Sequence, residues 1–121
     1  MKPITLIYIV NASLLLLHEI ESAYEKEWEL LKLPGKINGF LLLHIPIILF
    51  ILIGLIEIDK MTTAGLLIGI VLGVGGLIPF IVHKLVVRTP GQFSGLISNF
   101  IIFSNLLSGG ILMFFSIREI L

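Results

Sequence analysis

Long stretches of apolar residues, separated by short polar segments, make up most of this chain. Four stretches carry no charged residue, and they cover residues 3–17, 37–56, 61–82 and 93–117. The hydrocarbon core of a bilayer is about 30 Å thick, and an α-helix needs roughly 20 residues to cross it. The last three stretches meet this length, and the first does so if it continues through His18 to Ala23. The pattern therefore predicts four transmembrane helices, at about 4–22, 36–58, 62–87 and 93–117.

The polar segment at 23–33 mixes glutamate and lysine with aromatic and leucine side chains. Such a mixture is typical of a helix at the membrane surface, where aromatic rings sit at headgroup level. Pro34 and Gly35 then end the segment. We therefore predict one domain over residues 1–121, an all-α membrane protein. Its four transmembrane helices are expected to form an up-down bundle, with a short interfacial helical segment after the first helix.

Composition supports a membrane protein and excludes several other classes. Hydrophobic residues make up 57% of the chain and charged residues only 13%, which is too few to cover a soluble domain of this size. The net charge is zero and no block of like charge occurs, so the lipid bilayer is an expected partner and nucleic acid is not. The chain has no cysteine, which excludes thiolate metal ligands. Lys2 followed by apolar residues is similar to a signal peptide, but no cleavage site of the Ala-x-Ala type follows, so we expect a retained first helix.

Glycines recur every fourth residue in the third predicted helix, at Gly65, Gly69 and Gly73. Small residues at this spacing let helix backbones approach closely in a membrane. A dinucleotide-binding glycine loop is excluded because no strand precedes these residues. We therefore predict that this face of the third helix packs tightly against other helices.

The three histidines, His18, His44 and His83, each interrupt an apolar stretch. Short loops force four spans to run up-down-up-down, so the end of the first, the start of the second and the end of the third lie on one side of the membrane. A rise of 1.5 Å per residue from the predicted turns puts all three histidines about 6–13 Å inside that side. Ionisable side chains are costly inside a membrane and usually mark a functional site. We therefore predict one shared polar site.

This convergence favours a metal centre. His18 and Glu21 lie three residues apart on one helix, as in the Glu-x-x-His pairs of metal-binding helix bundles. Imidazole and carboxylate ligands suit divalent transition metals, and we expect zinc or iron. The predicted metal ligands are His18, Glu21, His44 and His83. The predicted supporting residues are Asn11, Glu25 and Asn105.

Other uses of the same residues stay open. The histidines could form a buried proton-binding or ion-pair network, or each could bond separately to a carbonyl, a serine or a lipid headgroup. His44 and His83 could also be axial haem ligands, although carboxylates beside a porphyrin would be unusual. A zinc metalloprotease is excluded because Ser22 stands where the His-Glu-x-x-His motif requires its second histidine. No binding motif for an organic cofactor is predicted.

The segment 17–30, Leu-His-Glu-Ile-Glu-Ser-Ala-Tyr-Glu-Lys-Glu-Trp-Glu-Leu, resembles a family of small, uncharacterised prokaryotic membrane proteins. In that family the first span ends in the signature His-Glu-Ile-Asp/Glu-x-x-Tyr-x-x-Glu-Trp. Leu33–Gly35 and Phe40–Pro46 are similar to the family's next element. The resemblance implies a membrane protein with a His/Glu centre, and it implies no reaction.

The pattern is also similar to the broader His-x-x-Glu-Glu membrane family, in which a later histidine and an Arg-x-Pro-Gly turn recur. His83 and Arg88–Gly91 would take those places here. Ser22 departs from the pattern because it replaces the second glutamate. A second carboxylate on the first helix would then have to come from Glu19 or Glu25.

These observations lead to three functional hypotheses. The first is a membrane protein with a His/Glu metal centre near one membrane face. Whether it is an enzyme stays open; an enzyme of this kind would act on a lipid-like substrate, with Glu25 or Glu19 as acid or base. The second is a small accessory subunit of a larger membrane complex, with structural histidines. The third is a homo-oligomeric ion or proton pathway.

The distribution of positive charge predicts the orientation. Five basic residues lie on the histidine side: Lys26, Lys32, Lys36, Lys84 and Arg88. Three lie on the other side: Lys2, Lys60 and Arg118. Because cytoplasmic loops carry an excess of lysine and arginine, we predict that the site faces the cytoplasm and both termini lie outside. The expected location is a prokaryotic inner or plasma membrane.

Overall fold

The computed structural model describes residues 1–86 and 91–121, which are mostly helical and contain no strand. The elements in chain order are α1 (Pro3–Tyr24), α2 (Glu27–Leu30), α3 (Lys36–Asp59), α4 (Thr63–Phe80), a π-helical segment η1 (Ile81–Val86) and α5 (Leu96–Ile120). Four helices are long and apolar enough to cross a membrane: α1, α3, α4 continued by η1, and α5. The predicted all-α bundle of four membrane-spanning helices is therefore confirmed. The expected end of the third span at Val87 and the turn residues Arg88–Pro90 lie outside the described residues.

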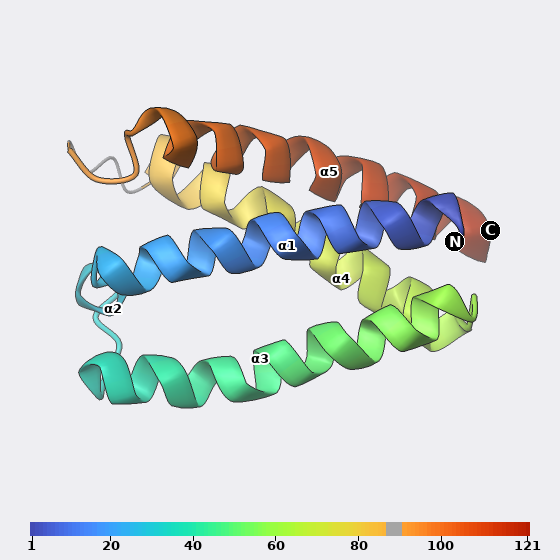
Figure 1. Ribbon diagram of the computed structural model, residues 1–121, viewed down its shortest axis with the longest axis horizontal. Coiled ribbons are helices and arrows are strands. Elements are labelled where there is room, and N and C mark those ends of the chain that lie inside the picture. The colour runs from blue at the N-terminus through green and yellow to red at the C-terminus, as the bar shows by residue number, and fades with distance from the viewer. Residues whose placement is uncertain (87–90) are drawn as a thin grey trace.

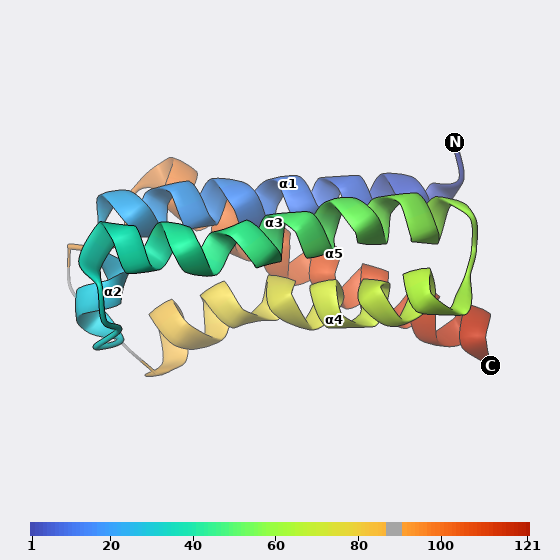
Figure 2. The same ribbon diagram turned by 90° about the horizontal axis from the view of Figure 1, so that it is seen from below.

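The four long helices run alternately up and down (Figure 1). Both chain termini lie at one end of the molecule, and α2 lies at the other end, beside the start of α3 (Figures 1 and 2). Helix α4 packs against all three other long helices, and most extensively against α5. Helix α3 contacts α1 and α4 but not α5 within the described residues, so it stands at the edge of the bundle.

Glycine allows the close approach of α4 and α5. A Cβ atom on Gly73 would lie 2.7 Å from the carbonyl oxygen of Gly109, and one on Gly109 would lie 2.5 Å from that of Gly73. Neither position has room for a side chain, because backbone atoms cannot move aside as a flexible side chain can. The glycine spacing predicted such packing, which depends on van der Waals contact since lipid gives helices no hydrophobic drive to associate.

Helices α1 and α3 are joined at two levels along their length. At the end that holds the termini, Thr5 Oγ1 donates a hydrogen bond to Asp59 Oδ1 at 3.0 Å, and Lys2 Nζ donates to the Asp59 carbonyl. One turn further along α1, the buried Tyr8 hydroxyl donates to the Ile51 carbonyl at 2.6 Å. These bonds fix α3 against α1 over one half of the bundle. Over the other half the two helices enclose the pocket described below.

The third span changes its helical type just before His83. The sequence pattern predicts one helix to about residue 87, but the α-helix ends at Phe80 and η1 continues from Ile81 to Val86. Pro79 lies inside α4, two residues before η1, and it cannot donate a backbone hydrogen bond to the preceding turn. Turns of π-helix are frequent at functional sites. His83 lies inside η1.

Candidate metal centre

A sharp turn after α1 brings Glu27 back toward the membrane-embedded end of the site. Helix α1 ends at Tyr24, and Lys26 adopts a left-handed conformation with φ 53° and ψ 51° before α2 begins at Glu27. A non-glycine residue rarely adopts this conformation, which costs roughly 1–2 kcal/mol. A helix continued through this point would carry Glu27 away from His18. The turn instead leaves Glu27 only 9% exposed and beside the histidines.

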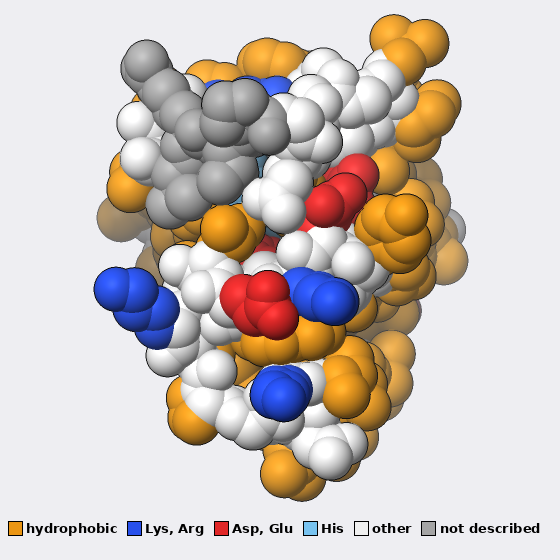
Figure 3. Space-filling view, turned by 90° about the vertical axis from the view of Figure 1, so that its left-hand side faces the viewer, with side chains coloured by type: hydrophobic (Ala, Val, Ile, Leu, Met, Phe, Trp, Pro, Cys, Tyr) orange, Lys and Arg blue, Asp and Glu red, His pale blue; other side chains and the backbone are white. Residues whose placement is uncertain are grey.

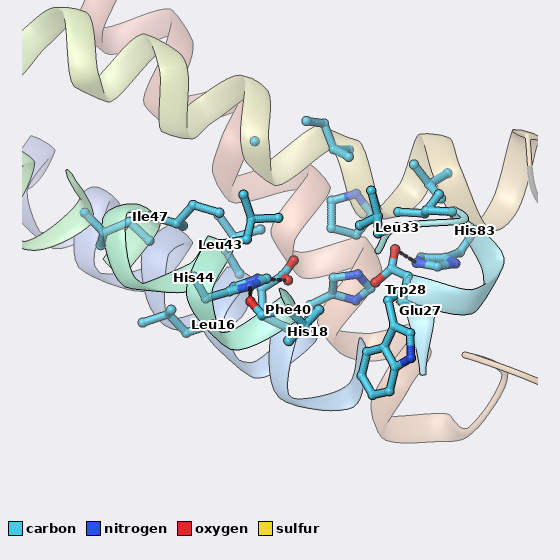
Figure 4. Close-up of a pocket in the computed structure, with 18 residues that line it drawn as sticks. Leu16, His18, Glu27, Trp28, Leu33, Phe40, Leu43, His44, Ile47 and His83 are labelled. Carbon is cyan, nitrogen blue, oxygen red and sulfur yellow. Dashed lines mark hydrogen bonds and ion pairs between the residues drawn. The ribbon is translucent and has the colours of Figure 1, made fainter. Parts of the chain in front are cut away.

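His18, Glu27 and His83 form a buried cluster. Each offers one ligand atom, and these three atoms lie within 4.8 Å of one another. Glu27 Oε1 lies 3.3 Å from His83 Nε2, and the ring centroids of His18 and His83 are 5.1 Å apart. The three side chains come from α1, α2 and η1 and converge at one end of the pocket (Figure 4).

The two histidines carry nitrogen atoms that lack hydrogen-bond partners. Within the described part of the chain, Nδ1 of His18 and both ring nitrogens of His83 are buried and unpaired. The contact of His83 with Glu27 has ion-pair distance but not the direction of a hydrogen bond, and Nε2 of His18 meets Ser22 Oγ only at 3.4 Å. Leaving a buried polar group unpaired costs about 1–3 kcal/mol. A metal ion that takes one nitrogen lone pair from each imidazole would remove part of that cost.

Phe93 covers the histidine pair from the segment before α5. Its ring stacks on His83 with 3.8 Å between centroids, and it lies 5.4 Å from the ring of His18. The side chain is only 2% exposed although its backbone has a φ of 51°. Residues held in such a conformation persist where surrounding structure fixes them, and they cluster at functional sites. Phe93 therefore keeps both imidazoles away from water.

Two opposing effects act on the pKa of Glu27. Burial alone would raise the pKa of the carboxyl group, but the imidazole of His83, the hydroxyl of Ser22 and the imidazole of His18 act against burial and hold the pKa below its usual value. Glu27 is therefore ionised at neutral pH. An ionised carboxylate is the form that binds a metal.

The cluster opens into a pocket of about 280 Å³ between α1, α3 and α4. The pocket contains polar side chains from His18, Glu19, Glu27, His44 and His83, so all three histidines line it. Most other lining residues are apolar, among them Leu16, Leu43, Ile47 and Ile78. Figure 4 shows Trp28 of α2 beside Glu27. The tryptophan is only 8% exposed and is part of the pocket wall.

Glu19 and His44 form a second polar group in this pocket. Glu19 Oε2 lies 2.6 Å from His44 Nε2, and His44 Nδ1 lies 2.7 Å from the Phe40 carbonyl. A carbonyl only accepts, so Nδ1 donates to it; at 2.6 Å, a proton is also needed between Nε2 and the carboxyl group. The ring of Phe40 stacks on His44 with centroids 4.0 Å apart. The pair thus holds one proton in a fixed geometry at the pocket wall.

A family model described as a family of unknown function (DUF6713) matches residues 4–119. The chain belongs to this family. No curated protein and no solved structure matches the chain. This match confirms the expectation of an uncharacterised family. The His-Glu-Ile-Asp/Glu signature and the broader His-x-x-Glu-Glu family stay predictions.

In this DUF6713 protein, two of the four predicted metal ligands come together and two lie elsewhere. His18 and His83 belong to the cluster. Glu21 lies on α1 three residues after His18, but its side chain meets α5, where its Oε1 accepts a hydrogen bond from Ser98 at 2.6 Å. His44 lines the same pocket but is paired with Glu19. Membership of Glu21 and His44 in a ligand set stays a prediction.

The remaining predicted residues also have clear positions. Glu19, an acid or base candidate, lies in the pocket, whereas Glu25 caps the end of α1 and is half-buried. Asn11 donates to the Leu72 carbonyl at 2.8 Å and belongs to the core, two helical turns from His18. Asn105 is also fully buried. It lies near Asn11, because the Oδ1 atoms of both residues lie next to Gly76. The two asparagines therefore support the bundle below the cluster rather than touch it.

Glu27 is the site residue that the sequence reasoning missed. In a continuous helix it would lie nine residues beyond His18, too far along the axis to share a ligand with it. The Glu-Trp pair at the end of the signature could have pointed to Glu27, because the side chains of Glu27 and Trp28 are the two that are buried in α2.

The end of the molecule that carries the site is charged on its outer surface. Figure 3 shows lysine and glutamate side chains there. Lys26, Lys32 and Lys36 are exposed, while His18 and His83 are 2% and 7% exposed. The cluster thus lies just inside a polar end of the bundle.

Proposed function

We propose that this protein is a membrane metalloprotein in which His18, Glu27 and His83 bind one divalent transition metal ion, zinc or iron, near one membrane face. The observation that carries the proposal is the meeting of three potential ligand atoms within 4.8 Å, from three separate elements of an apolar bundle. Buried ionisable groups are rare in membrane spans and usually serve a site. The unpaired imidazole nitrogens supply a second, independent reason to expect a bound cation.

The spacing of the cluster suits such an ion. Metal–ligand bonds of about 2.1 Å in a tetrahedral site put neighbouring ligand atoms about 3.4 Å apart. The Glu27–His83 separation of 3.3 Å already has this value. The wider separations in the cluster, up to 4.8 Å, would close by side-chain rotation. The set of two histidines and one carboxylate is shared by catalytic zinc sites and by non-haem iron sites, both of which keep an open coordination position.

An enzyme acting on a lipid-like substrate is the extension that the pocket supports. A metal ion held by three protein ligands supplies a Lewis acid or an activated water. Glu27 and the histidines would hold it, and Phe93 would exclude water from the far side. The Glu19–His44 pair lies in the same pocket and could deliver or accept a proton. The apolar walls favour a substrate with a hydrocarbon part.

Metal analysis of the purified protein tests the proposal. The wild-type protein in mild detergent should contain close to one zinc or iron per chain by inductively coupled plasma mass spectrometry, and His83→Ala should lose it. Serine-bonded Glu21 provides the matched control, since Glu21→Gln should keep the metal if the cluster is the site. A wild-type protein without metal after growth and purification in zinc- or iron-supplemented medium would overturn the proposal.

Stability gives an independent reading of the same claim. A metal that binds only the folded protein, at a free concentration of 100 times its Kd, stabilises it by about 2.7 kcal/mol. Zinc should therefore raise the thermal midpoint of the wild-type protein in detergent and leave that of His83→Ala unchanged. An equal rise in both proteins would place zinc outside the cluster.

The membrane orientation belongs to this proposal as well. The exposed lysines at the site end support a cytoplasmic position for that end, by the excess of basic residues in cytoplasmic loops. The chain has no cysteine, so single cysteines introduced at Lys26 and at Lys60 would report the side by their access to a membrane-impermeant thiol reagent.

A further inference from the structure

The pocket at the metal cluster continues toward the lipid-facing surface of the bundle. A second hollow lies between α3 and α4, and it shares Ile47, Ile51, Gly75 and Ile78 with the pocket. Its other lining residues are apolar, and Val71, Val74 and Phe50 are more than a third exposed on the outer face of the bundle. In a membrane that face contacts hydrocarbon rather than water. We call this second hollow the α3–α4 groove.

We propose that the α3–α4 groove is the lateral entrance and tail-binding site for a single-chain amphiphile, whose oxygen-bearing polar head reaches the metal cluster. The binding of the head to a metal ion rests on the proposed function, whereas the binding of the tail rests on the α3–α4 groove alone. The ligand class is a molecule with one long hydrocarbon chain and a carboxyl, carbonyl or hydroxyl group at its end.

The arrangement of polar and apolar walls along the pocket supports this ligand. His18, Glu27 and His83 lie at the end near the membrane face, and the Glu19–His44 pair follows. Figure 4 places Ile47 at the opposite end of the pocket from His83. Ile51 lies a further turn along α3, about 10 Å deeper than His44. A lipid in one leaflet has the same order, with its head at the face and its tail toward the midplane.

The size of the pocket favours a ligand with one chain. Its volume of about 280 Å³ is just below the range for small-molecule sites, roughly 300–1,000 Å³. The charges also fit an oxygen-bearing head. The Glu19–His44 pair is neutral as a unit, and a divalent cation with one carboxylate and two neutral imidazoles leaves a net positive charge at the end of the pocket.

Gly75 is the point at which the entrance can be closed. It lines both the pocket and the α3–α4 groove. A Cβ atom there would meet only Leu15 Cδ2, at 3.6 Å, which is ordinary contact. The backbone at this position therefore has room for a side chain, and a large one would narrow the passage that Gly75 lines. Gly110 of α5 is a matched control, since a Cβ there meets no atom within 4 Å and the residue is remote from the passage.

A photoreactive fatty acid with a diazirine near its methyl end, added to the full-length protein in lipid nanodiscs, tests the proposal. Labelling mapped by mass spectrometry should be saturable and should include Ile51, which is only 4% exposed and so shielded from bulk lipid. Gly75→Phe should reduce this labelling about tenfold or more by steric exclusion, and Gly110→Phe should not. Ile47→Trp, which narrows the same passage from α3, should act like Gly75→Phe and serves if that variant fails to fold.

Labelling that rises linearly with probe, stays on the exposed faces and is the same in all folded variants would overturn the proposal. Metal content measured on the same samples separates the two claims. Saturable labelling of a protein without metal would leave the tail site standing and remove the metal centre. Bound metal without saturable labelling would do the reverse.

Discussion

Replacing Glu27 by glutamine is the sharpest test of the cluster, because the change removes a charge and keeps the size of the side chain. Glu27 supplies the only carboxylate among the three ligand atoms, and its oxygen already lies 3.3 Å from His83 Nε2. Loss of a residue that merely orients a ligand weakens metal binding about 10- to 100-fold. Loss of a direct ligand should exceed this range. We therefore expect Glu27→Gln to weaken zinc binding by more than about 100-fold, or about 2.8 kcal/mol.

Competition with a chelating zinc indicator, in detergent at fixed pH, measures this change directly. Glu21→Gln serves as the control, because Glu21 lies on the same turn of α1 as His18 but bonds to Ser98. Its zinc affinity should stay within about threefold of wild type, since distant or unlinked sites add only a few tenths of a kcal/mol. Wild-type zinc affinity in Glu27→Gln, together with reduced zinc affinity in Glu21→Gln, would refute Glu27 as a metal ligand. That result would support the ligand set predicted from helical spacing.

Three further predictions concern the surroundings of the site. Gly73→Leu should destabilise the protein by roughly 1–3 kcal/mol or prevent assembly, because the added atoms meet the backbone of α5, whereas Gly110→Leu should have little effect in the same thermal or denaturant unfolding assay in detergent. Glu19→Gln should cost roughly 1–2 kcal/mol of stability by weakening the bond to His44 while leaving the metal affinity unchanged, and a loss of metal in this variant would place the pair in the ligand set. Lys26→Gly should keep or raise stability and metal affinity, because glycine adopts a positive φ freely. Lys26→Val should lower both. Equal stability and metal affinity in the two variants would show that the turn does not set the position of Glu27.

The amphiphilic pattern of the chain was sufficient to predict the fold. Uninterrupted apolar runs of spanning length leave few alternatives to transmembrane helices, and short polar connections leave few alternatives to an up-down order. The same constraint brought the three histidines to one end, since their positions along each span follow from the rise per residue. This is why a shared pocket for His18, His44 and His83 could be expected before any coordinates.

The membership of the cluster could not be derived in this way. Helical spacing shows that His18 and Glu21 share a flank of α1, but the neighbouring helices decide which partner each meets, and Glu21 meets Ser98 of α5. Glu27 depends on the conformation of one residue, Lys26, whose left-handed backbone no propensity rule favours. Local backbone exceptions of this kind are invisible to periodicity.

The origin of the three cluster residues has a consequence for the biogenesis of the protein. His18 and Glu27 emerge early from the ribosome, with α1 and α2, whereas His83 enters the membrane only with the third span. The carboxyl-terminal part of that span must therefore be in place before the side chain of His83 can join the other two. If the cluster binds a metal as proposed, loading is a late step that follows insertion of the third span, and a chain whose insertion stalls after α3 would not bind the metal.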